Sequence, residues 1–177
     1  MLKPQKKSQS NRYSRRCESI SRLRNLSPNK EKIMNRIIGS PDLVKAIYYP
    51  NSDFLDQADV EVPEELINDN IHLKKRIPLD EETKTFITID ITDFKPAPNN
   101  PRFKRATVYI YVLIHNSLFS TDYGVLRMDY ILSKIDDLFN DKRGVGDFRL
   151  KFKSIRDVSV NTSYEGKFIA FDLLEFN

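Results

Sequence analysis

The sequence predicts an α+β domain in which helices pack mainly on one face of a four-stranded, mostly antiparallel sheet. Three observations predict this class. Two regions repeat apolar residues every three or four positions, as amphipathic helices do, and four segments alternate as strands do. Their order is helix, strand, strand, helix, strand, strand, which is typical of an α+β fold. A chain of 177 residues suits one such domain with appendages.

The first helical region begins at Ser27-Pro28, a cap hydroxyl followed by a proline at the first helical position. Ile33, Ile37 and Ile38 give it an apolar stripe, and a second short helical piece from Asp42 to Tyr48 ends before Pro50. We expect the long helix over about 123–140. Its apolar repeat comprises Met128, Ile131, Leu132, Ile135, Leu138 and Phe139.

Strands are predicted at 85–91 and 106–115, and we expect them to pair. Between them, the proline-rich stretch 96–101 predicts a loop that no strand ladder crosses. Phe148, Leu150 and Phe152 alternate with basic residues and predict a half-buried third strand. A turn at 164–166 then leads into the last strand, 167–176, which completes a hairpin.

The two central strands are apolar on both faces. On the strand ending at His115, Val108 and Ile110 share one face, while Tyr109, Tyr111 and Leu113 share the other. One long helix covers only one face of a small sheet. The second face is therefore covered by the N-terminal helix within the monomer, or it is an association surface of several hundred Å².

Charge divides the chain into a basic arm and a mildly acidic body. Residues 1–26 hold eight Lys and Arg against one Glu, a net +7, so the remainder of this +4 chain carries −3. The arm has too few large apolar residues to fold alone, and we expect it to be flexible. Residues 27–177 form the single domain. Within it, residues 50–84 are predicted to be a long, partly ordered, partner-facing excursion.

Three interpretations of the arm stay open: it neutralises DNA or RNA phosphates, it docks on an acidic protein surface, or it only aids solubility. Tyr13 is its sole aromatic residue, so the stacking platform of a single-strand binder is missing. The candidate contacts are the cations Lys6, Lys7, Arg12, Arg15, Arg16, Arg22 and Arg24.

The residues predict no enzyme and no cofactor. His72 and His115 have no companion at catalytic or metal-ligand spacing, and five glycines leave little for a phosphate-binding loop. A metal nuclease using Asp90 and Asp93 is the sharpest enzymatic alternative. Glu165 and Lys167 beside Asp147 form a weaker one, because a polar hairpin turn explains these residues more simply.

The lone Cys17 and the basic N-terminus favour a reducing cytoplasm. No stretch reaches the ~18 uninterrupted apolar residues of a membrane span, so we expect no membrane partner.

Certain strings, in this order, resemble tail terminator proteins of tailed bacteriophages, also called tail completion or neck proteins. The resemblance covers 30–177 loosely and 106–176 best. The strings are Leu43-Val44-Lys45-Ala46-Ile47, the strand 109–115, Asp122-Tyr123-Gly124, the helix segment 131–139, Phe148-Arg149-Leu150, Asp157-Val158-Ser159-Val160 and Tyr164-Glu165-Gly166-Lys167.

The resemblance implies a non-enzymatic virion protein, assembled in the bacterial host cytoplasm, that forms a ring, commonly a hexamer, at the head-tail junction. It caps the tail tube and meets neck, adaptor or portal proteins, with the sheath and channel DNA as further expected contacts. Interface candidates are Tyr109, Tyr111, Leu113, Ile169 and Phe171. Docking-loop candidates are Asn116, Ser117, Leu118, Phe119 and Asp122. The main alternative is a nucleic-acid-binding module that uses the arm.

Overall fold

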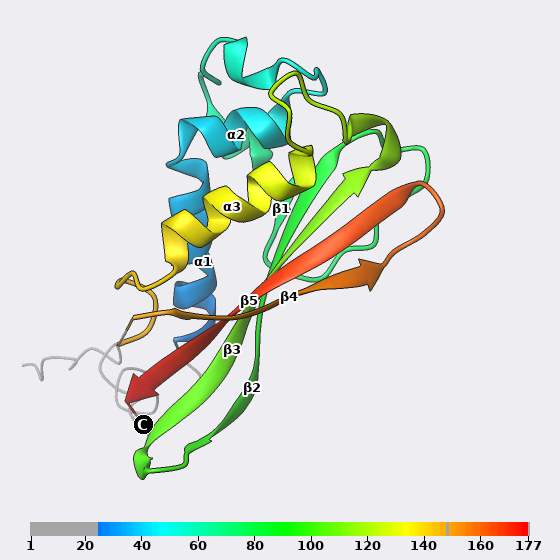
Figure 1. Cartoon of the computed structure of the whole chain (residues 1–177). Helices are drawn as coiled ribbons and strands as arrows, with labels where there is room; N and C mark the ends of the chain where they lie inside the picture. The colour runs from blue at the N-terminus through cyan, green and yellow to red at the C-terminus, as the bar shows by residue number, and fades with distance from the viewer. Residues whose placement is uncertain (1–24, 148, 177) are drawn as a thin grey trace, which may run out of the picture.

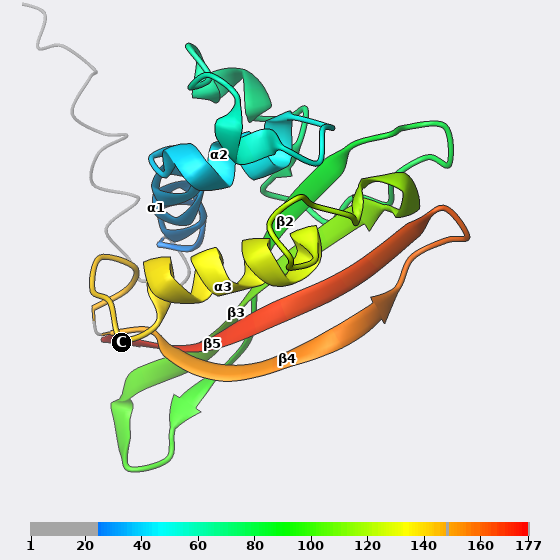
Figure 2. The same cartoon turned by 45° about the horizontal axis from the view of Figure 1, so that its top comes forward.

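The computed structural model describes residues 25–147 and 149–176, which form one mixed sheet with helices packed on one face (Figure 1). The α+β class is therefore confirmed. The helices of the described chain are α1 (Leu26–Ile38), α2 (Pro41–Tyr48) and α3 (Arg127–Phe139), with short 3-10 turns η3 (Phe54–Asp56), η4 (Pro63–Leu66) and η5 (Asn116–Leu118). Figure 2 shows the three helices along the same side of the sheet.

Within the described residues the sheet has five strands instead of the predicted four. They are β1 (Ile71–His72), β2 (Thr85–Ala97), β3 (Asn100–His115), β4 (Lys151–Ser159) and β5 (Tyr164–Phe176), in the order β1-β2-β3-β5-β4. The extra strand, β1, runs parallel to β2, and the other pairings are antiparallel. Only two residues long, β1 has no alternation that a sequence pattern could reveal. Asn70 holds it in place by donating its side-chain amide to the Thr85 carbonyl at 2.9 Å.

Several predicted boundaries were wrong. The ladder between β2 and β3 continues through the proline-rich stretch, with Pro96 paired to Lys104 and Ala97 to Asn100. Proline is tolerated there because, in the described chain, the outer side of β2 pairs with β1 only at Ile87 and Thr88. The turn between β4 and β5 falls at 160–163, before the predicted position, since Ser159 pairs with Glu165. Helix α3 begins at Arg127 instead of about Tyr123.

The main core lies between the sheet and the helices. Val108 and Ile110 of β3 are fully buried there. The antiparallel register pairs Val108 with Phe171 and Ile110 with Ile169, so these two β5 residues face the helices as well. The first half of the 50–84 excursion also enters this core, through Phe54, Leu66 and Ile71. For this first half, the expectation of a partner-facing excursion was wrong, because these three apolar side chains are buried in the monomer.

Residues 73–84, here called the strap, cross the end of the opposite sheet face. The Arg76 guanidinium lies 4.9 Å from the ring centroid of Phe86, and the Asn161 side chain donates to the Pro78 carbonyl at 3.1 Å. The Tyr164 hydroxyl donates to the Glu82 carbonyl. A small second cluster beneath the strap comprises Phe86, Leu113 and Tyr164.

Arg127, the first residue of α3, is a fully buried cation that ties three segments together. Its guanidinium donates to five backbone carbonyls: Leu118 at 2.8 Å, Ala46 at 3.0 Å, Tyr49 at 2.5 Å, Pro50 at 3.3 Å and Asn51 at 2.5 Å. The carbonyls of Ala46 and Tyr49 lie at the C-terminal end of α2. Carbonyls at that end of a helix lack intrahelical donors, and a positive charge is favoured there. Burial lowers the pKa of Arg127 to about 10, which leaves it charged at neutral pH.

We expect Arg127→Lys to lower the free energy of unfolding by about 3 kcal/mol or more. Lysine cannot reach all five carbonyls, and each buried acceptor left without a donor costs ~1–3 kcal/mol. The control is Lys134→Ala on the same helix, which removes a partly exposed ion pair with Asp42 and costs at most about 1 kcal/mol. Urea denaturation followed by circular dichroism compares them, and equal losses would contradict the role given to Arg127.

Candidate functional site

The sheet face opposite the helices, here called the open face, carries an aromatic cluster. Tyr109, Tyr111 and Phe168 are each half-buried on it. The ring centroids of Tyr109 and Phe168 lie 5.2 Å apart and those of Tyr111 and Phe168 5.7 Å apart, both edge-to-face. Such pairs stabilise the sheet while leaving apolar surface exposed, as in many association surfaces.

Two acids border the open face. The Tyr109 hydroxyl donates to Asp93 at 3.0 Å, and Asp90 forms an ion pair of 2.8 Å with Lys30 of α1. Burial raises the pKa of Tyr109 and Tyr111, and the neighbouring carboxylates add to the rise. Both tyrosines therefore stay protonated at neutral pH and present hydroxyl donors.

The nuclease alternatives gain no support from the geometry. Asp90 and Asp93 are engaged by Lys30 and Tyr109, and no group of three or more metal-ligating side chains occurs in the part of the chain that the structure describes. The Lys167 Nζ atom lies 3.5 Å from the Asp157 carboxylate across the β4–β5 hairpin, which agrees with a polar hairpin that serves structure alone. The absence of enzymatic activity stays a prediction.

The two histidines take part in local structure. The ring of His72 lies 3.1 Å from both the Asp69 carbonyl and Arg76, and burial, with help from Arg76, lowers its pKa. His115 Nδ1 lies 2.7 Å from the Ser117 hydroxyl and accepts from the Ser117 backbone at the start of η5.

The predicted interface residues do not share one surface. Tyr109 and Tyr111 lie on the open face, but Leu113 is buried beneath the strap. Ile169 and Phe171 are 0% exposed in the helix-side core, so they have no surface to offer a partner. The reason is register: Tyr109 stands opposite Ala170, and the residue of β5 that joins the aromatic cluster is Phe168.

The predicted docking loop is held to the rest of the chain. Asn116 donates its side-chain amide to the Thr162 carbonyl, and Leu118 is buried. Phe119 is half-buried and its carbonyl accepts from the Arg127 backbone, while Asp122 is exposed and its backbone donates to Ser52. Asn116, Ser117 and Asp122 remain accessible, and their docking role stays a prediction.

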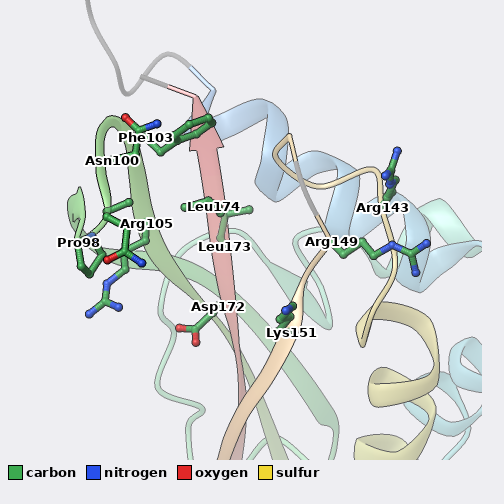
Figure 3. Close-up of a pocket in the computed structure, with 12 residues that line it drawn as sticks. Pro98, Asn100, Phe103, Arg105, Arg143, Arg149, Lys151, Asp172, Leu173 and Leu174 are labelled. Carbon is green, nitrogen blue, oxygen red and sulfur yellow. The ribbon is translucent and has the colours of Figure 1, made fainter.

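A basic groove of about 580 Å³, which sequence reasoning missed, lies at the far end of β5 (Figure 3). Phe103 and Leu174 contribute to its apolar lining. Arg105 stands on the side of the β2–β3 hairpin, and Arg143, Arg149 and Lys151 stand on the other side. Arg149 is paired with Asp141 at 2.8 Å, whereas Arg105, Arg143 and Lys151 form no ion pair within the described residues.

The net charge does not signal this groove, because the acidic residues of the body offset its cations in the sum. The available signal was a high local density of basic residues at 102–105 and 142–153. The arm candidates Lys6, Lys7, Arg12, Arg15, Arg16, Arg22 and Arg24 lie outside the described residues.

A family model named YomW matches residues 40–173, which is most of the chain and includes every strand except the end of β5. The chain belongs to the YomW family. The name is associated with phages of Bacillus, so the match supports a phage-related protein without reaching a specific role. No curated protein matches the chain. Among the described residues of this YomW family member, no helix is long and apolar enough to cross a bilayer.

The division between core and open face predicts unequal losses of stability. Phe171→Ala should lower the free energy of unfolding by about 3–5 kcal/mol, because a fully buried aromatic leaves a cavity. Tyr111→Ala on the open face should cost less than half as much, since its ring is already partly in water. Urea unfolding of the monomer measures both, and a larger loss for Tyr111 would contradict this assignment of faces.

Proposed function

We propose that this chain is a structural subunit of a phage tail, a tail terminator that assembles into a ring, caps the tail tube and joins it to the neck. The observation that carries the proposal is the open face, where Tyr109, Tyr111 and Phe168 remain half-exposed on a sheet that its helices cover from one side only. Membership of a phage-associated family and the resemblance to tail terminators support the same role.

The role requires an association surface and no catalytic centre. In a ring, each contact is heterologous, so a patch on one subunit meets a different patch on the next. The edge strand β4 offers a second apolar surface, with Phe152 46% and Ile155 43% exposed. The proposed partners are other copies of this chain, the tail tube protein, and neck, adaptor or portal-side proteins. Sheath and channel DNA are further contacts of the same proposed position in the virion.

Light scattering after size exclusion tests ring formation, at low and high salt and with or without purified tail tubes. We expect particles of about six subunits that persist in high salt, because apolar contacts are not screened. Negative-stain images of the peak should show rings. A strict monomer under all these conditions, tubes included, would contradict the proposal. If that monomer bound nucleic acid in a salt-sensitive way, the arm-based binding module would replace it.

Replacing Tyr109 and Tyr111 together by serine should shift the ring toward monomer at equal concentration, because the aromatic contact area is lost. The matched control is Tyr48→Ser, which removes a tyrosine that is 49% exposed on α2, away from the open face. Thermal unfolding checks that both variants fold. A ring that survives the double change as well as the control would remove the open face from the assembly surface.

A further inference from the structure

The strap carries an exposed apolar and acidic projection, here called the knob: Ile77, Leu79, Asp80 and Glu81. Ile77 and Leu79 are each 67% exposed, more than any other large hydrophobic residue in the described chain. Two strongly exposed aliphatic side chains on one projection, next to two acids, form a small apolar patch with a charged border, as protein-binding surfaces do. The side chains of Ile77 and Leu79 are removed from water only when a partner surface covers them.

The knob is held in shape before any partner arrives. Pro78 between the two aliphatic residues is buried, and its carbonyl accepts from Asn161. The next four residues form a turn closed at both ends, since the Glu82 backbone donates to Leu79 at 3.1 Å and the Leu79 backbone donates to the Glu82 carboxylate at 3.0 Å. A preformed projection loses little conformational entropy on docking.

The basic groove complements the knob in both chemistry and sign. Its apolar floor includes Phe103 and Leu174, and its rim includes Arg105, Arg143 and Lys151, which form no ion pair within the described residues. Its lining also holds one acid, Asp172, whose carboxylate is paired with Lys153 at 3.4 Å. Asp80 and Glu81 form no ion pair with described residues, because only Glu82 of this turn is paired, with Arg76 at 2.5 Å. A partner made of phosphates alone would leave the apolar floor and the aliphatic knob unused.

Knob and groove cannot meet within one molecule. The strap lies at the end of β3 near His115, and the groove lies near Arg105 on the same strand. The ten residues between these positions span roughly 33 Å of strand. Figure 1 shows the β2–β3 hairpin at one end of the sheet and the β4–β5 hairpin at the other. The complementary surfaces therefore belong to different copies.

We infer that the knob of one copy docks into the basic groove of the next, and that this heterologous contact links consecutive subunits. The inference rests on the proposed ring. Ile77 and Leu79 enter the apolar floor, while Asp80 and Glu81 face the rim cations Arg105, Arg143 and Lys151. Ile77 and Tyr111 line the same small pocket, so the knob and the open face form one side of the contact. That larger side is needed, because stable interfaces bury roughly 800 Å² per partner.

Charge reversal with rescue tests the contact on the full-length chain. One variant carries Asp80→Lys with Glu81→Lys, a second carries Arg143→Glu with Lys151→Glu, and a third combines all four changes. All four side chains are exposed, so folding should be kept, and thermal unfolding checks it. The matched control is Glu64→Lys with Glu65→Lys, two adjacent exposed acids on η4 that give the same change in charge.

We expect each one-sided reversal to weaken self-association by about 100-fold or more in light scattering, because like charges then face each other across the contact. The combined variant should regain rings, and the control should match the wild type. Replacing Ile77 and Leu79 by serine should weaken the rings in high salt too, since that part of the contact is apolar.

Two results overturn the inference alone. In the first, the wild type forms rings and both one-sided reversal variants form them equally well. In the second, the combined variant stays as dissociated as the one-sided variants. If the groove reversal instead lowers only nucleic-acid binding and leaves the rings unchanged, the groove takes phosphates and the inference is wrong. A wild-type chain that never forms rings, even with tail tubes, overturns the proposed function as well. The measurement on the wild-type chain thus separates the failure of the inference from the failure of the proposed function.

Discussion

The guanidinium of Arg127 joins parts of the chain that are about eighty residues apart in sequence, through hydrogen bonds to carbonyls at the end of α2, in the loop after it and in η5. It has no carboxylate partner in this network. The cation is instead solvated by backbone dipoles, which is an alternative to an ion pair for a buried charge. Phe54 closes the site, with its ring centroid 4.7 Å from the guanidinium carbon. This one side chain thus fixes the start of α3 against the end of α2, next to the apolar contacts that the two helices share in the core.

Once α1, α2 and α3 are fixed on one face, few of the described residues are left to cover the other. The strap covers only the end of that face, over Phe86 and Leu113. The aromatic cluster is therefore left half-exposed, and Ile77 and Leu79 of the strap are turned outward. Asymmetric coverage of one sheet thus creates the surfaces that assembly of identical subunits would use.

Register explains why the candidate site was only partly predictable. The period-two pattern identified Tyr109 and Tyr111 as neighbours on one face of a strand, and the structure keeps them together. The same pattern in β5 cannot say which of its two apolar rows joins them. That choice depends on the pairing of Tyr109 with Ala170, which involves residues 61 positions apart. The basic groove has the same origin, because β3, β5, the segment before β4 and the first residue of β4 supply its cations and floor.

The sequence by itself determined the α+β class, the order of the main elements, the two-faced central strands and the charge difference between arm and body. These follow from local periodicity, composition and capping, which act over a few residues. Only the tertiary structure decided the fifth strand, the ladder through Pro96, the burial of Ile169 and Phe171, and the groove. Each of these depends on which distant segments pair and in which register, and on where Arg127 and the strap leave the sheet uncovered.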